Sequence, residues 1–267
     1  MKLFSMFLFG ALTLAACKKE GCTDPNAINY DPNAKKNDGS CQMAASQGTV
    51  TVEMSHVWGM SQAPFSLNTQ LIHPMTNDTL TYSTFKYYIS NFELKSTDGT
   101  WWKHPESYFL VDADDPTTMD LSLTGVPEGS YTDVRFVMGV DSTRNVSGAQ
   151  TGALSTTNGM FWSWNTGYIM VKAEGASPNA SSGNFTYHLG GFSGANNIVT
   201  TKEFAFGGTL NVTSTGTPKV KLSANPARLF HTYGSVSNGP MVHMPGIDAV
   251  TLADGFYGGV SFLEIVQ

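Results

Sequence analysis

Short segments rich in β-branched and aromatic residues, each followed by turn-forming residues, recur from residue 49 to the C-terminus. In the first of them, residues 50–57, apolar and polar residues alternate, which predicts a strand with one buried face. No convincing amphipathic helix of ten or more residues is evident. The pattern predicts an all-β fold, an antiparallel β-sandwich or barrel-like domain with long loops and little helix. The other candidate strands are residues 65–69, 85–94, 101–102, 108–112, 134–141, 168–172, 185–188, 202–206, 210–213, 220–224 and 259–267.

Length and charge limit the classes of protein to which this chain can belong. Residues 49–267 form a stretch that is long for an average domain but normal for a single β-sandwich. Only 13% of the residues are charged, and the formal net charge is −6. The sequence contains no basic run, which argues against nucleic acid as a partner. We therefore expect one β domain over residues 49–267.

The first sixteen residues have the features of an export signal. Met1-Lys2 is a short basic start, and residues 3–16 are a largely apolar run that is too short to span a bilayer comfortably. Small residues before a cleavage point mark a secretory signal peptide. Because Cys17 follows them directly, residues 1–16 resemble a bacterial lipoprotein signal, which implies that Cys17 is lipidated.

The expected location follows from that signal. The lipid on Cys17 would be the only contact with the membrane. It would anchor the exported chain to the bacterial cell envelope, at the periplasmic or surface face of the outer membrane. The alternative is a plain signal peptide, with Cys17 in a disulfide.

Residues 17–48 form a second region, in which Cys22 and Cys41 bracket a turn-rich segment. If Cys17 is lipidated, these two cysteines remain as an even pair, and an oxidising compartment favours a disulfide between them. Such a bridge would contribute roughly 3 kcal/mol to a segment too small to have a core. The sequence Asp-Pro-Asn-Ala occurs twice, seven residues apart. The segment resembles the Cys-bounded modules of surface proteins from Bacteroidetes-type bacteria.

The oxygen-bearing side chains of this segment are of the kind that Ca²⁺ prefers as ligands. Their spacing is not that of an EF-hand, and solvated turns are the favoured alternative, because Asp-Pro and Asp-Gly form turns. Residues 42–48 are expected to be a linker. The candidate calcium ligands are Asp24, Asp31, Asn33 and Asp38.

The sequence offers no catalytic constellation. It has no Gly-rich phosphate loop, no Gly-x-Ser-x-Gly elbow and no Cys-x-x-Cys pair. No free thiol remains if the cysteines are used as described, and the carboxylates are scattered without a convincing pair. We therefore expect that the protein is not an enzyme.

Histidine in the company of methionine and tryptophan is the most distinctive chemical feature. His56 and Trp58 lie two residues apart on the first candidate strand, so their side chains should share one face. His73 is followed by Pro and Met, and His243 lies within two residues of two methionines. Imidazole with thioether favours Cu(I), whereas imidazole with oxygen suits Cu(II). For each histidine taken alone, a hydrogen-bonded structural role is the alternative. The six histidines are His56, His73, His104, His188, His231 and His243.

A set of motifs, in a fixed order along the chain, carries a family resemblance. They are Tyr-Tyr-Ile-Ser-Asn at 87–91 with Leu94, Val-Pro-Glu-Gly-Ser-Tyr at 126–131, Phe-Val-Met-Gly-Val-Asp at 136–141, Gly-Met-Phe-Trp-Ser-Trp-Asn-Thr-Gly-Tyr at 159–168, Glu174-Gly175 and Phe-Thr-Tyr-His-Leu-Gly at 185–190. With these motifs the chain from Val50 onward resembles the MbnP-like family, the periplasmic or surface copper-binding proteins associated with methanobactin operons.

The resemblance implies an all-β fold and a particular kind of metal site. Related copper proteins bind the metal through two His and a tryptophan oxidised to kynurenine. A partner di-haem peroxidase of the MauG type is implied to carry out that oxidation. His56 and His188 best match the implied ligands, and His243 is a third ligand candidate. Trp58 is the candidate for oxidation, and the alternatives are Trp162 and Trp164.

Two functions from different classes fit these observations. The favoured one is a lipid-anchored, extracytoplasmic copper-binding protein that captures or hands over copper, in which the rings of His56 and His188 should converge. The alternative is a surface interaction or structural β-module without metal. Its binding loops would be residues 142–158, 176–184 and 225–250, which are rich in Ser, Gly and Asn.

Overall fold

The computed structural model describes residues 18–148, 150–162 and 167–267. The signal peptide predicted at residues 1–16 and the lipidation site predicted at Cys17 lie outside the described residues. The chain divides into two compact units, of which the second is Ser46–Gln267.

The unit before Ser46 is held together by a disulfide and by turns. Cys22 and Cys41 form the predicted disulfide, which confirms that pairing. Two short parallel strands, β1 (Glu20–Gly21) and β2 (Lys36–Asn37), pair beside it. Asp24, Asp31 and Asp38 each accept a hydrogen bond of 2.9 Å from the backbone N–H two residues further on. The repeated Asp-Pro-Asn-Ala sequence is therefore a repeat of Asx turns.

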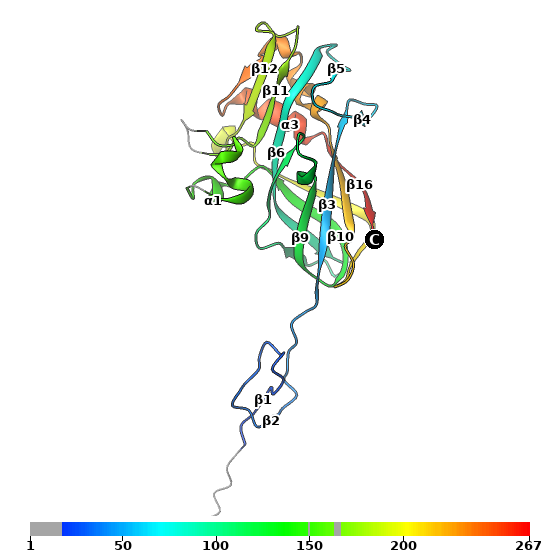
Figure 1. The fold of residues 1–267 in the computed structure, drawn as a ribbon, viewed down its shortest axis with the longest axis vertical. Coiled ribbons are helices and arrows are strands. Elements are labelled where there is room, and N and C mark those ends of the chain that lie inside the picture. Colours follow the sequence, from blue (N-terminus) through cyan, green and yellow to red (C-terminus); the bar gives the residue numbers. More distant parts are fainter. Residues whose placement is uncertain (1–17, 149, 163–166) are drawn as a thin grey trace, which may run out of the picture. The chain divides into compact units, whose positions relative to one another are not determined.

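The larger sheet of the second unit is built on one long strand, β6 (Thr79–Ser96). Its strand order is β13-β10-β6-β11-β12-β15, and β5, β8 and β7 pair with successive parts of β6. Figure 1 shows β11 and β12 together in one half of the unit. The other strands of this sheet are β5 (Gln70–Ile72), β7 (Trp101–Lys103), β8 (Tyr108–Asp112), β10 (Gly129–Met138), β11 (Val171–Ala176), β12 (Asn184–Leu189), β13 (Thr200–Val212) and β15 (Met241–Val242).

The smaller sheet is built on β3 (Gln47–Trp58). Its order is β16-β14-β3-β4, and β9 also pairs with β3. The β3–β14 pair is parallel, whereas the β3–β9 and β14–β16 pairs are antiparallel. The remaining strands are β4 (Ala63–Pro64), β9 (Asp120–Pro127), β14 (Lys219–Ala224) and β16 (Val260–Val266). The predicted all-β, sandwich-like fold is confirmed, with the correction that the sheets are mixed rather than purely antiparallel.

The core lies between the two sheets, and β3 shows how the sequence forms it. Its buried side chains occur at every second position: Val50, Val52, Met54, His56 and Trp58. This is the alternation expected of a strand with one buried face. Each large side chain that is removed from water contributes about 2 kcal/mol.

Helices close the core at one end of the sandwich, which the sequence did not reveal. Helix α3 (Ile247–Tyr257) places Phe256 against Phe85 and Tyr87 of β6, with ring centroids 5.2 and 5.1 Å apart. The expectation of no helix of this length is therefore wrong. The other short helices are η1 (Pro116–Thr118), α1 (Ser142–Asn145), η2 (Gly152–Leu154), η3 (Thr156–Asn158), η4 (Gly194–Asn196), η5 (Pro226–Leu229), α2 (Phe230–Tyr233) and η6 (Val236–Asn238).

Two further elements differ from prediction. Residues 65–69 do not form a strand, although Phe65 is buried in the core. The strand β9 (Asp120–Pro127) was not among the candidate strands. None of the helices in the described ranges is long and apolar enough to cross a membrane.

Gly175 tests the packing of β11 between β6 and β12. A Cβ on Gly175 would lie 2.2 Å from the carbonyl oxygen of Thr81 and 2.7 Å from Cζ of Phe185. We expect Gly175→Ala to lower the free energy of unfolding by about 3 kcal/mol, because a backbone oxygen cannot move aside. Urea unfolding of the full chain measures this. The matched control is Gly208→Ala on β13, where the nearest atom is 3.8 Å away. Its effect should stay below about 1 kcal/mol, and equal losses in the two variants would contradict the described packing.

Candidate metal centre

His56 is a core residue enclosed by aromatic rings. It is 9% exposed. Its ring meets Phe65, Phe85 and Tyr87 edge-on, at centroid distances of 6.0, 5.6 and 5.7 Å. Its Nε2 lies 3.0 Å from the hydroxyl of Tyr87. Burial disfavours the charged form and lowers the pKa of His56 to about 4, so the ring is neutral at pH 7.

His188 lies on the other face of the larger sheet. On β12 the buried side chains are Phe185, Tyr187 and Leu189, and His188 alternates with them. Its Nε2 lies 2.6 Å from Oε1 of Glu174 on the neighbouring strand. His56, in contrast, packs against the core-facing rings of β6. The structure therefore does not bring His56 and His188 together, because the sheet separates their side chains.

His243 and its two neighbouring methionines are solvent-exposed. Met241 begins β15, and His243 and Met244 follow it; β15 pairs with β12 at Thr186 and Tyr187. Of the pockets found in the described ranges, none is lined by both His243 and another histidine. His243 therefore does not share a pocket with His56 or His188, the other two predicted ligands.

Trp58 is in contact with a different histidine from the ones predicted. Its side chain is 7% exposed, and its Nε1 donates a hydrogen bond of 3.0 Å to the carbonyl oxygen of Ile72. The ring stacks on Phe65 at 6.1 Å, and it meets the ring of His73 edge-on at 6.2 Å. The histidine beside Trp58 in space is thus His73, which follows fifteen residues later in the sequence.

His73 is buried and its tautomer is fixed by its neighbours. It is 2% exposed. Its Nδ1 accepts a hydrogen bond of 3.1 Å from the backbone N–H of Thr76. Its Nε2 lies 3.0 Å from the carbonyl oxygen of Ala227, which can only accept, so Nε2 carries the proton. Desolvation lowers the pKa of His73, and the ring is neutral.

A pocket of about 140 Å³ brings His73 together with His231, Met60 and Met75. These residues come from three segments: the turn after β3, the turn before β6, and the η5–α2 region. Met60 is 86% and Met75 59% exposed, and His231 is also exposed. The neighbouring His73 and Met75 are evident in the sequence, but His231 and Met60 were not among the predicted ligands. One sequence signal could have indicated Met60: it follows Trp58 by two residues, as Met75 follows His73.

Buried hydrogen bonds fix the walls of this pocket relative to one another. Asn225 is buried, and its side-chain oxygen accepts from the backbone N–H of Gly59 at 3.1 Å. Its side-chain nitrogen donates to the carbonyl oxygen of Gly59 at 2.9 Å. Together with the His73–Ala227 bond, this pair ties the turn after β3 and the turn before β6 to η5. The position of the donor atoms therefore rests on contacts between residues far apart in the chain.

The aspartates among the candidate calcium ligands are engaged in local contacts. Asp31 forms an ion pair of 2.7 Å with Lys19 in addition to its turn hydrogen bond. No group of three or more His, Cys, Asp or Glu side chains that could hold a metal ion occurs in the described ranges. The structure thus does not assemble the calcium site considered for Asp24, Asp31, Asn33 and Asp38, and their oxygens serve local turns.

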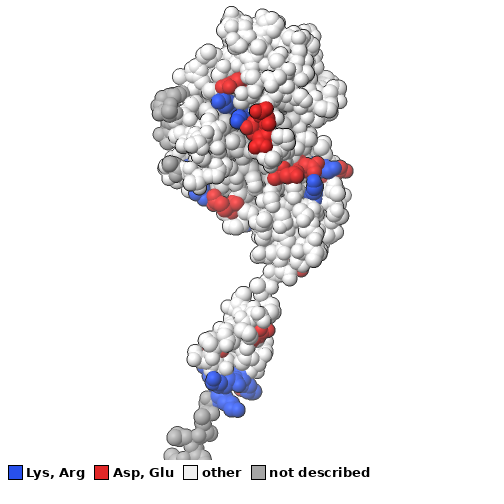
Figure 2. Space-filling model, in the orientation of Figure 1, with Lys and Arg blue, Asp and Glu red and all other residues white. Residues whose placement is uncertain are grey.

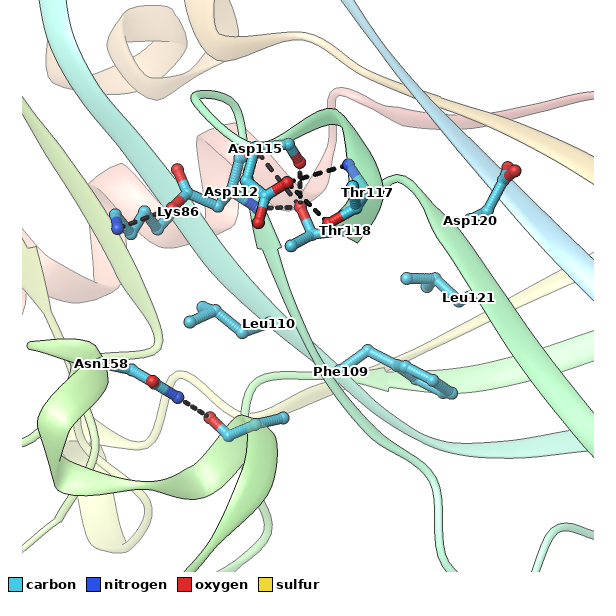
Figure 3. Close-up of a pocket in the computed structure, with 11 residues that line it drawn as sticks. Lys86, Phe109, Leu110, Asp112, Asp115, Thr117, Thr118, Asp120, Leu121 and Asn158 are labelled. Carbon is cyan, nitrogen blue, oxygen red and sulfur yellow. Dashed lines mark hydrogen bonds and ion pairs between the residues drawn. The ribbon is translucent and has the colours of Figure 1, made fainter.

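A larger pocket, of about 370 Å³, has acidic side chains along its rim. Figure 3 shows Lys86 beside Asp112, with an N–O distance of 2.6 Å, and Asp115 beside Thr117. Asp115 accepts hydrogen bonds from the N–H and hydroxyl of Thr117 and caps η1. These carboxylates are already paired or hydrogen-bonded. Figure 2 shows the charged side chains of this face as small mixed clusters separated by wide uncharged areas.

Trp162, one of the two tryptophans considered as alternatives, does not line the pocket of His73 and His231. Trp162 is buried, and a Cβ on Gly190 would lie 2.4 Å from its Cη2, so it packs closely on the backbone. Trp164 lies outside the described residues.

The buried neutral state of His56 predicts a pH dependence of stability. Its folded-state pKa of about 4 lies below the ordinary value of 6.5, so the unfolded state binds the proton first as the pH falls. The stabilisation is complete above pH 6.5 and is lost progressively between pH 6.5 and 4. Between about pH 7.5 and about pH 5, wild type should lose about 2 kcal/mol more than His56→Phe. Urea unfolding at both pH values measures the difference, and equal losses would contradict it. His73 and His104, whose pKa values burial also lowers, are common to both proteins.

Comparison with known proteins places the chain in a family. The sequence profile of MbnP matches residues 47–244. A solved structure, MbnP from Methylosinus trichosporium, matches at 18% identity over 66% of this chain and 76% of that one, with a TM-score of 0.42. No curated protein matches the chain. Because the family profile covers most of the sequence, including the larger sheet and the pocket of His73 and His231, the chain belongs to the MbnP family.

Proposed function

We propose that this protein is a lipid-anchored, extracytoplasmic copper-binding protein, which captures or hands over copper and is not an enzyme. Membership of the MbnP family supports a copper-related role outside the cytoplasm. The signal-like residues 1–16 followed by Cys17 support export and lipid anchoring at the cell envelope.

The observation that carries the proposal is the pocket in which two His and two Met meet beside Trp58. Thioether and imidazole are soft donors, and this combination favours Cu(I) over Mg²⁺, Ca²⁺ or Mn²⁺. No carboxylate is found among the described residues that line the pocket. The donor set therefore fits a soft monovalent metal and does not fit a hard one.

The four candidate donors differ in how easily they could bind a metal. His231, Met60 and Met75 are exposed, so their donor atoms can turn toward a metal without breaking a buried contact. His73 uses both ring nitrogens in hydrogen bonds, and ligation through Nε2 would replace its bond to Ala227. We infer that His231, Met60 and Met75 hold copper, and that His73 either joins them by releasing Ala227 or orients the pocket wall.

Trp58 is the proposed site of oxidation by a di-haem peroxidase of the MauG type. Its ring edge faces His73, so an oxidised indole would lie next to the pocket. A kynurenine at this position would add an amine and a carbonyl beside His73. This extends the family expectation of two His and a modified Trp to Trp58, His73 and His231.

A second candidate function rests on a different observation. Met241, Met244 and Ile247 are exposed apolar side chains on one short segment between η6 and α3. Exposed apolar clusters are found at interaction sites. A surface interaction module that uses this segment is the alternative to copper binding.

Copper binding can be tested by competition for Cu(I) with a coloured chelator, using the full chain. We expect about one Cu(I) per chain. Met60→Leu, Met75→Leu and His231→Ala should each weaken binding by at least about tenfold, since even the loss of an outer-shell partner costs that much. The matched controls are His188→Ala and His243→Ala, which lie away from the pocket. Undiminished binding in the three pocket variants would exclude this site.

Oxidation of Trp58 can be tested by mass spectrometry. In protein purified from its native host, we expect the peptide that contains Trp58 to gain a few daltons, the change from tryptophan to kynurenine. The Trp58→Phe protein should lack the gain, and the peptide that contains Trp101 and Trp102 serves as the internal control. An unmodified Trp58 peptide in copper-loaded native protein would show that oxidation is not part of the site.

A further inference from the structure

One arginine of this chain has no side-chain partner among the described residues. The sequence contains three arginines, and two of them are paired: Arg135 with Glu93 and Arg144 with Glu106. Arg228, on η5, makes no ion pair and no side-chain hydrogen bond with any of the residues that the structure describes. Its Nε is buried and unsatisfied.

The side chain of Arg228 is held in place by the backbone of the α3–β16 turn. A Cβ on Gly259 would lie 2.6 Å from Cγ of Arg228, and one on Gly258 would lie 3.6 Å from its Nη2. The aliphatic stem therefore lies against Gly259, where a Cβ would collide with it, and the guanidinium lies in van der Waals range of Gly258. An arginine fixed in this way has already lost much of the conformational freedom that binding would cost.

Arg228 lines the same pocket as His73, His231, Met60 and Met75. The pocket thus contains a half-buried guanidinium whose charge the described residues around it leave unmatched, since none of the side chains lining it is acidic. An uncompensated charge with a buried, unsatisfied donor is costly to a folded protein. A bound anion would match this charge by accepting hydrogen bonds from the two terminal nitrogens.

We propose that this pocket binds a small carboxylate, with Arg228 as the anion-binding residue. The planar guanidinium matches a carboxylate with two parallel hydrogen bonds. A volume of about 140 Å³ is below the range of drug-sized sites, so the ligand has few heavy atoms. The walls formed by Pro74, Met60 and Met75 suit a short apolar tail behind the carboxylate. The site shares its pocket with the proposed copper ligands, but it does not require copper.

The test is calorimetric titration of the copper-free full chain with propionate. We expect saturable binding, weakened roughly tenfold to a hundredfold in Arg228→Gln, since a hydrogen bond to a charged group is lost. Arg228→Lys keeps the charge but lacks the planar pair of donors, and it should bind with intermediate affinity. Arg144→Gln, which removes a paired arginine from another pocket, should bind as wild type does. Propionamide, which has the same shape without the charge, should not bind.

Several outcomes would overturn the proposal. They are absence of saturable propionate binding, equal affinity in Arg228→Gln and wild type, or binding of propionamide as tight as that of propionate. Tighter Arg228-dependent binding of inorganic phosphate or chloride than of propionate would overturn the carboxylate assignment. Thermal unfolding checks that each variant is folded, and propionate should raise the unfolding temperature of Arg228→Lys but not of Arg228→Gln.

Copper titration separates this proposal from the copper site. Removing a positive charge next to a bound cation should leave Cu(I) binding by Arg228→Gln equal to or tighter than that of wild type. Loss of propionate binding together with intact copper binding therefore confirms the role of Arg228. Intact propionate binding in a chain that takes no copper would overturn the proposed function and leave the anion site standing.

Discussion

The contact between the buried face of β3 and the aromatic face of β6 is the interaction on which the rest of the second unit depends. His56 and Trp58 lie on the buried face of β3, and they meet Phe85, Tyr87 and Tyr82 of β6. Because side chains alternate along each strand, this contact determines which face of its sheet each residue of β3 and β6 occupies. It makes His56 a neutral core residue and leaves Trp58 at the end of the core, beneath the pocket. Helix α3 then closes the same end through Phe256.

The sequence predicted those parts of the fold that depend on local pattern. The alternation in residues 50–57 placed His56 and Trp58 on one face, and the structure does so. The Cys22–Cys41 pair followed from counting cysteines in an exported chain. Helix α3 was missed because it is buried on several sides: Ala249, Leu252, Ala253 and Phe256 are all inaccessible, so no clear polar stripe marks a helical period.

The candidate metal site could be predicted from the sequence only as a kind of chemistry. The His, Met and Trp content indicated a soft metal, but the ligand pair was chosen by motif and proximity in sequence. The alternation of side chains along a strand could have argued against pairing His188 with His56, since Phe185 and Tyr187 are core residues of β12 and His188 faces the other way. The pairing of His73 with the η5–α2 region could not be predicted, because it joins segments more than 150 residues apart: the Nε2 of His73 bonds to Ala227, 154 positions later. Such contacts follow from the whole topology and leave no local signal.

The pocket combines a rigid frame with adaptable donors. The Asn225–Gly59 and His73–Ala227 hydrogen bonds are buried, so breaking either would leave an unsatisfied polar group, and the frame resists change. Met60, Met75 and His231 project from this frame with exposed side chains, and methionine is flexible enough to follow a ligand. Arg228 adds a fixed positive charge to the same space. A cation bound by neutral donors beside an arginine is repelled, and the repulsion grows with the charge of the ion. The pocket therefore favours a monovalent over a divalent metal unless an anion is bound as well, which links the choice of metal to the occupant of Arg228.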